Sequence, residues 1–135
     1  MLFDMIGRNN PFNLRYSKNN HWLGLTGQTR GFCDFVNVDF CIRAVAIMIM
    51  RTYRKNNVVT ISEIINRYAP PSENNTQKYI DFVCNRLGCF PFDCPSRDAY
   101  PALLLAISVY EGNPLTLDSI NFALAKFNIV PYKKK

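Results

Sequence analysis

The chain has 135 residues, which fits a single domain spanning 1–135 and is long enough to bury a hydrophobic core. Hydrophobic residues make up 48% and charged residues 19%, a balance that excludes an intrinsically disordered chain. The formal net charge of +6 favours an anionic partner such as nucleic acid, an acidic membrane surface or a cell-wall polymer. Residues 132–135 are interpreted as a basic tail.

The N-terminal third is expected to form a loop, a ribbon and a central helix. An Asn-rich stretch at 9–21 predicts a structured loop, because Asn accepts turn conformations. Two short, Gly-bounded aromatic stretches, 22–27 and 31–36, predict the two strands of a small ribbon. The segment 39–55 predicts a buried helix, because every residue from 44 to 50 is apolar. This apolar run is too short to span a bilayer, so no transmembrane segment is expected.

The rest of the chain predicts four further helices. Thr60 and Glu63 have the spacing of a capping box, which opens a short helix that the Ala-Pro-Pro sequence at 69–71 ends. The other helices are expected at 76–87, at 100–111 and after Thr116. The sum is an α+β domain, mostly helical, with about five helices, a short ribbon and the helix 39–55 at its centre.

Metal and cofactor chemistry is not expected. The five cysteines are odd in number and include no Cys-x-x-Cys pair, and His21 is the only histidine. The regular spacing of Cys84, Cys89 and Cys94 matches no usual zinc arrangement. Free cysteines indicate synthesis in a reducing compartment, and the first eight residues have no secretory-signal pattern.

Several motifs together resemble a known family. They are Asn9-Asn10-Pro11-Phe12-Asn13-Leu14-Arg15, Trp22-x-Gly24, Gly31-Phe32-x-x-Phe35, and the block from Thr60-Ile61 through Arg67-Tyr68-Ala69-Pro70-Pro71-Ser72-Glu73-Asn74-Asn75-Thr76 to Tyr79-Ile80. This pattern resembles phage-encoded proteins of lysozyme-like type, which are described as virion structural proteins or peptidoglycan-degrading lysins. The resemblance covers roughly residues 8 to 115. It implies a lysozyme-like domain whose target is bacterial peptidoglycan, with other virion proteins as further partners.

The sequence departs from that pattern at three positions. Phe12 stands where the family has Gly, Cys41 where the helix start has Gly, and Tyr68 where the block has Trp. A Gly at position 12 would permit a positive φ that Phe disfavours. A looser similarity links the layout to cell-wall glucosaminidases, but their catalytic Glu has no counterpart here, because the segment before the Asn-rich loop contains only Asp4 as an acid.

Two carboxylates are the candidate catalytic residues, because cleavage of a glycosidic bond uses a pair of carboxyl groups. Glu73 is the first choice, since it lies between a Pro-Pro turn and a helix start. A helix dipole alone also favours an acid at that place. Glu111 is the second choice, because an acid at the end of a helix opposes the dipole and therefore invites a functional interpretation. The alternative for Glu111 is an exposed residue in the last helical turn, without a functional role.

Five residues are candidates for substrate binding: Asn10, Asn13, Arg15, Trp22 and Tyr79. Amide groups hydrogen-bond sugar hydroxyl and N-acetyl groups, an aromatic face stacks on a sugar ring, and Arg binds a carboxylate. The alternatives are turn formation for the Asn residues and core packing for Trp22.

Two classes of function remain open at this stage. The first is a peptidoglycan-degrading, glycan-cleaving phage or prophage protein that acts in host lysis or cell-wall penetration. The second is a non-catalytic virion structural or cell-wall-binding protein of the same fold. Both imply synthesis in a bacterial cytoplasm, followed by association with the virion or release to the cell wall. A nucleic-acid binder rests on net charge alone, because no recognition motif is present.

Overall fold

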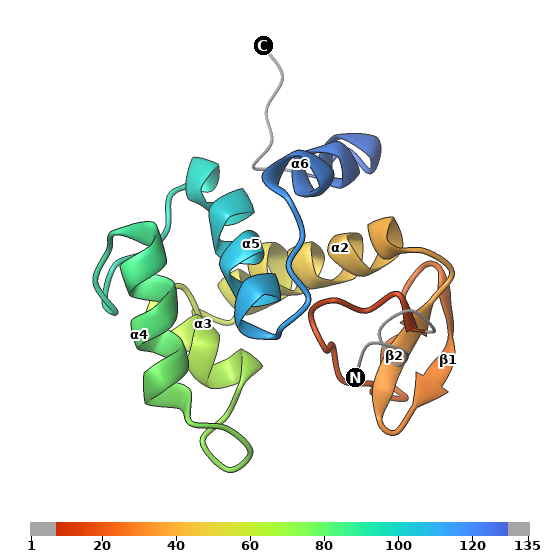
Figure 1. Cartoon of the computed structure of the whole chain (residues 1–135), viewed down its shortest axis with the longest axis horizontal. Coiled ribbons are helices and arrows are strands. Elements are labelled where there is room, and N and C mark those ends of the chain that lie inside the picture. The colour runs from red at the N-terminus through yellow and green to blue at the C-terminus, as the bar shows by residue number, and fades with distance from the viewer. Residues whose placement is uncertain (1–7, 130–135) are drawn as a thin grey trace.

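The computed structural model describes residues 8–129, and its longest helical segment crosses the middle of the molecule (Figure 1). This segment consists of α2 (Val38–Ile47) and a π-helical continuation, η1 (Met48–Tyr53). Eight of its side chains belong to the hydrophobic core: Cys41, Ile42, Ala44, Val45, Ala46, Ile49, Met50 and Tyr53. The prediction of a buried central helix is confirmed, and its C-terminal part has wider turns than expected.

The remaining helices pack around this axis. They are α3 (Ile61–Tyr68), α4 (Thr76–Leu87), the 3₁₀ turn η2 (Arg97–Ala99), α5 (Tyr100–Tyr110) and α6 (Leu117–Lys126). Helix α6 packs on α2, while α4 lies at one side of the molecule and packs against both α3 and α5 (Figure 1). The fold class is therefore a small, mostly helical α+β domain, as predicted.

The strands form one antiparallel hairpin, β1 (Leu25–Thr29) and β2 (Phe32–Phe35), beside the start of α2. The predicted first strand, 22–27, was placed too early. The backbone N–H of Leu25 bonds the carbonyl of Trp22 in a turn, and the strand then runs through Gly27 as far as Thr29. The chain reverses instead at Arg30 and Gly31, where both φ angles are positive.

The Asn-rich loop is attached to this hairpin by an isolated antiparallel bridge to β2. Arg15 pairs with Phe32, and the backbone N–H groups of Tyr16 and Cys33 bond the carbonyls of Gly31 and Leu14 at 2.8 and 2.9 Å. Phe12 is fully buried and does not have a positive φ. The left-handed positions in this loop are Asn9 and Asn13, both at φ 51°, so Phe at position 12 requires no strained backbone.

The helix starts follow local sequence signals. The capping box of Thr60 and Glu63 is formed, Asn75 caps α4, and Thr116 caps α6. Gly88 ends α4 in the left-handed conformation. The capping box of Thr60 and Glu63 and the helix start at Thr116 were predicted from the sequence. Asp4 and the expected basic tail at 132–135 lie outside the described residues.

Candidate functional site

A polar cleft of about 350 Å³ lies where the Asn-rich loop faces the turn that follows α3. Its walls also include the end of α5 and the π-helical part of the central helix. The lining residues are Asn13, Leu14, Arg15, Phe32, Met48, Tyr53, Arg67, Tyr68, Ala69, Pro70, Glu73, Asn74 and Glu111. Both predicted catalytic carboxylates, which come from distant parts of the chain, therefore line one cleft.

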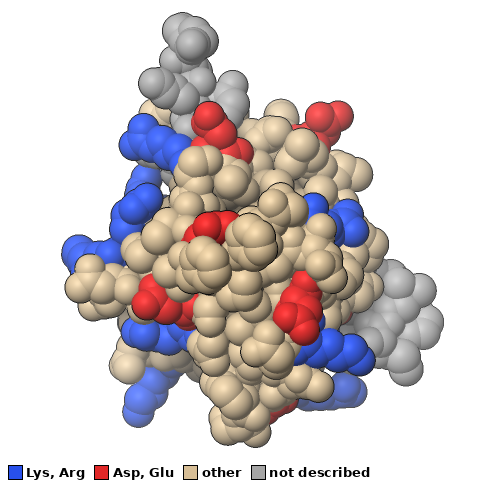
Figure 2. All heavy atoms as spheres, turned by 90° about the vertical axis from the view of Figure 1, so that its left-hand side faces the viewer, with Lys and Arg blue, Asp and Glu red and all other residues tan. Residues whose placement is uncertain are grey.

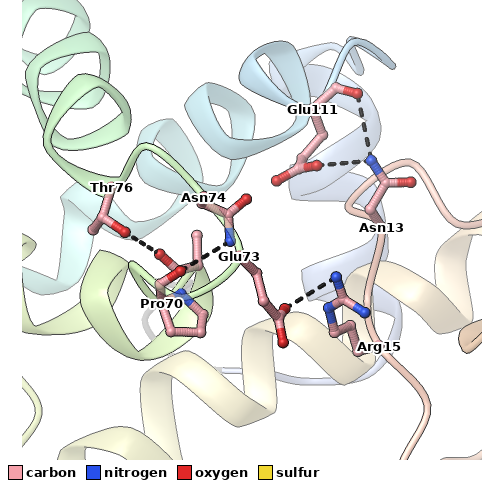
Figure 3. Close-up of polar contacts among 8 residues, drawn as sticks. Asn13, Arg15, Pro70, Glu73, Asn74, Thr76 and Glu111 are labelled. Atoms are coloured by element: carbon pink, nitrogen blue, oxygen red, sulfur yellow. Dashed lines mark hydrogen bonds and ion pairs between the residues drawn. The ribbon is translucent and has the colours of Figure 1, made fainter.

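Glu111 is the more firmly held of the two acids. It follows directly after the last residue of α5 and is half-buried. The Asn13 side-chain amide donates to Oε1 at 2.7 Å, and the Tyr79 hydroxyl donates to Oε2 at 2.8 Å. Figure 3 shows the Glu111 side chain directed from the end of α5 toward Asn13 on the opposite loop. Two donors from separate elements thus fix the orientation of the carboxylate plane.

Tyr79 lies behind Glu111, outside the lining of the cleft. Its side chain is only 1% exposed, and its ring stacks on Tyr110 with a centroid distance of 3.9 Å. Burial, together with the nearby Glu111 carboxylate, raises the pKa of Tyr79 far above its ordinary value. The hydroxyl therefore keeps its proton and donates a hydrogen bond to Glu111. The predicted contact between Tyr79 and substrate is not available in this arrangement.

Glu73 enters the cleft from the turn between α3 and α4. Its Oε1 forms an ion pair with Nη2 of Arg15 at 3.0 Å, and Figure 3 shows the two side chains pointing toward each other. Both side chains are about half exposed, at 45% and 59%, so solvent screens this pair. The turn itself is fixed, because the backbone N–H of Glu73 and the Asn74 side chain both bond the carbonyl of Pro70.

The guanidinium of Arg15 also lies over the Phe32 ring, 5.1 Å from its centroid. A second guanidinium, that of Arg8, lies 5.0 Å from the same centroid and is 3.5 Å from Oδ1 of Asn13. Asn13 therefore connects Arg8 with Glu111. The predicted site residues Asn13 and Arg15 both belong to the cleft.

Asn10 and Trp22, the other two predicted binding residues, do not line the cleft. Asn10 is fully buried, and its amide bonds the backbone of Leu14 and Cys33 at 2.9–3.0 Å. Asn10 connects the loop to β2, and its side chain is not accessible to a ligand. The prediction that Asn10 binds substrate is therefore wrong. Trp22 is half-buried and packs against the hydrophobic core. The structure therefore agrees with the alternative of core packing for this residue.

Sequence reasoning did not select nine residues of the cleft wall, and four of them have large side chains that shape it: Met48, Tyr53, Arg67 and Tyr68. The Tyr68 hydroxyl donates to the Phe12 carbonyl at 2.5 Å, and burial raises the pKa of Tyr68 well above its ordinary value. Arg67 and Tyr68 occupy the last turn of α3, immediately before the Pro-Pro turn. Their place beside Glu73 in the sequence was the available signal for this part of the wall.

The charge on the face that carries α4 is not a continuous basic patch. Figure 2 shows Lys and Arg mainly toward the two edges of this face, with Asp and Glu between them. In the part of the chain from 8 to 129, no three His, Cys, Asp or Glu side chains are grouped closely enough to hold a metal ion. None of the helices in that part is both long and apolar enough to cross a membrane.

The fold and the cleft thus define a small α+β protein with two acidic side chains on one polar cleft. No protein-family model matches the chain. It is 35% identical over 125 residues to Protein P5 of Pseudoalteromonas phage PM2, an alignment that covers 85% of this chain and 76% of P5. The chain belongs to the family of this phage protein, in agreement with the phage origin expected from its sequence.

Proposed function

We propose that the protein degrades peptidoglycan by cleaving its glycan strands, in host lysis or in penetration of the cell wall. The observation that supports this proposal is the meeting of Glu73 and Glu111 on one cleft with Asn13 and Arg15. Hydrolysis of a glycosidic bond uses two carboxyl groups that flank the reacting bond. Membership in a phage protein family is compatible with a protein carried in the virion, and the proposal adds that its target is the cell wall.

Glu111 is assigned the proton-transfer role. Transfer of a proton to a leaving oxygen requires a carboxyl group in a fixed position, and Glu111 is held from two sides by Asn13 and Tyr79. Each carboxylate oxygen has two lone-pair positions, so each keeps one for the substrate or a water molecule. This reverses the order of preference drawn from the sequence, where Glu73 came first.

Glu73 is assigned the second role, that of facing the positively charged centre that develops on the sugar. It is more exposed than Glu111, and its ion pair with Arg15 keeps its carboxylate at the cleft surface. Asn13 and Asn74 supply amide groups beside the two acids. These amides suit the hydroxyl and N-acetyl groups of an amino sugar.

The test is the degradation of purified cell walls, followed by loss of turbidity and by release of reducing ends or anhydro-sugar products. Glu111→Gln is expected to lower the rate at least about 100-fold, the usual contribution of a proton-transfer group. Glu73→Gln is expected to lower it as well. Asp118→Asn, an exposed change in the first turn of α6, is the matched control and keeps full activity. Intact walls after treatment with native protein over a range of pH and salt would refute the proposal.

The second candidate is a non-catalytic wall-binding or virion structural protein. It is favoured by the Arg15 ion pair, which occupies the Glu73 carboxylate. Such a protein sediments with insoluble peptidoglycan and releases no fragments. The same wall preparation therefore separates the two candidates.

A further inference from the structure

Arg67 is a cation on the cleft wall that has no carboxylate partner within residues 8–129. The cleft contains a second lining arginine, Arg15, but that guanidinium is already paired with Glu73 at 3.0 Å. Arg67 comes from the last turn of α3, and its guanidinium carbon lies 5.6 Å from the centroid of the Tyr53 ring. Tyr53 is buried and also lines the cleft, so Arg67 lies against a wall of the cleft.

An arginine held against an aromatic ring is well suited to bind a carboxylate. The ring restrains the flat face of the guanidinium, while its N–H groups point outward in the plane. A carboxylate accepts two parallel hydrogen bonds from such a group, which a neutral amide cannot do. The alternative explanation, an exposed arginine that only complements the dipole at the end of α3, does not require the guanidinium to lie over the ring of Tyr53 on the cleft wall.

We propose that Arg67 is a specificity-determining residue that binds a carboxylate on the substituent of the substrate glycan. This inference rests on the proposed function, and it defines the substrate class as acidic muramyl peptides in preference to neutral glycans. Peptidoglycan carries such carboxylates on the peptides attached to its sugars. The role that the sequence suggested for Arg15 thereby passes to Arg67, whose guanidinium has no ion pair in the described part of the chain.

The test compares two ligands that differ in a single charge, N-acetylmuramyl-L-alanine, which carries one carboxylate, and its neutral C-terminal amide, N-acetylmuramyl-L-alaninamide. Binding to the full chain is measured by NMR titration or calorimetry, so the result does not depend on catalysis. Native protein is expected to bind the acid about fivefold to tenfold more tightly than the amide, the value of one charge-assisted pair. Equal affinity for the two ligands, or no binding of either at millimolar concentration, would overturn the inference.

Variants of Arg67 test whether this residue causes the preference for the acidic ligand. Arg67→Met keeps the length of the side chain but removes its charge, and it is expected to bind both ligands equally. Arg67→Lys keeps the charge without the planar fork and is expected to retain part of the preference. Arg86→Met is the matched control, because Arg86 lies outside the cleft with its guanidinium carbon 5.9 Å from the Phe82 ring centroid. Thermal unfolding of each variant verifies that it is folded.

Two outcomes separate this inference from the proposed function. Wall degradation by native protein with no preference between the two ligands refutes the role of Arg67 alone. A clear preference for the acid with no degradation of walls supports a binding protein whose cleft still selects muramyl carboxylates. Persistence of the preference in Arg67→Met would also contradict the inference, since another group would then supply it.

Discussion

At the scale of single residues, Asn10 shows how the same side-chain chemistry serves two purposes. Its amide has the donors and acceptor that a sugar-binding residue needs, but the structure uses them within the protein. Oδ1 accepts from the Leu14 N–H, and Nδ2 donates to the carbonyls of Leu14 and Cys33. Asn13, three residues further on, turns the same group toward Glu111. Sequence alone does not distinguish these two orientations, because each depends on contacts with distant segments.

Asn10→Ala is expected to destabilise the protein by about 3 kcal/mol, because it leaves several buried backbone groups without partners. The measurement is the free energy of unfolding from urea denaturation. Asn19→Ala, in an exposed part of the same loop, is the control and is expected to change stability by less than about 0.5 kcal/mol. Similar losses in the two variants would show that Asn10 is not the attachment point of the loop.

At the scale of elements, the helix starts were the most predictable features. Thr60, Asn75 and Thr116 each bond a backbone N–H in the first turn that follows, which is a contact within four residues. Such contacts depend on local sequence and little on the rest of the fold. The strand was less predictable, because β1 extends past Gly27 only through its pairing with β2.

The capping box of α3 leads to a prediction about pH. Hydrogen bonds from the backbone N–H groups of Thr60 and Val59 lower the pKa of Glu63 below its ordinary value of 4.5. Because the folded pKa is the lower one, the ionised cap stabilises the protein above about pH 4.5. That contribution is lost as the pH falls through the lowered value. Glu63→Gln is therefore expected to be less stable than native protein at pH 7.

Denaturant unfolding of both proteins in steps from pH 7 to pH 3 measures this effect. The difference in unfolding free energy between native protein and Glu63→Gln is expected to shrink over the acidic part of the range. A difference that stays constant throughout would show that ionisation of Glu63 does not contribute to stability.

At the scale of the whole molecule, one close contact positions the hairpin on the central helix. Gly24 has φ 81°, and a Cβ atom there would lie 2.3 Å from Cγ of Phe40. Phe40 is itself fixed by Phe127, with ring centroids 5.2 Å apart. The side chain at position 24 is therefore excluded both by the backbone conformation and by the packing of the hairpin against α2.

Gly24→Ala is expected to cost about 3 kcal/mol of stability, from a strained φ and from a clash that must move Phe40. Gly31→Ala is the matched control. Gly31 has a similar φ of 87° but no atom within 4 Å of an added Cβ. Its substitution therefore measures only the cost of placing a side chain at a positive φ. Thermal or urea unfolding of the two variants gives the difference. Equal losses of stability in the two variants would mean that Phe40 moves away from the added methyl group without a cost in free energy.

The candidate site was predictable in its parts but not in its assembly. Glu73, Glu111, Asn13 and Arg15 were all selected from sequence, and all four line the cleft. The contact between Asn13 and Glu111 joins residues 98 positions apart, so no local pattern indicates it. Tyr79 was selected for the cleft but lies behind Glu111, because the rotation of α4 about its axis is set by its packing on α5.

The π-helical part of the central helix has a consequence for comparing this chain with its relatives. Met48 and Tyr53 both line the cleft, although five residues in a regular α-helix place side chains about 140° apart. The wider turn brings them to the same side, because it closes over five residues. The side chains after residue 47 are thus rotated about the helix axis relative to those of a regular helix continued from residues 38–47. An alignment drawn without a gap there would match cleft residues with core residues in any relative whose helix is regular.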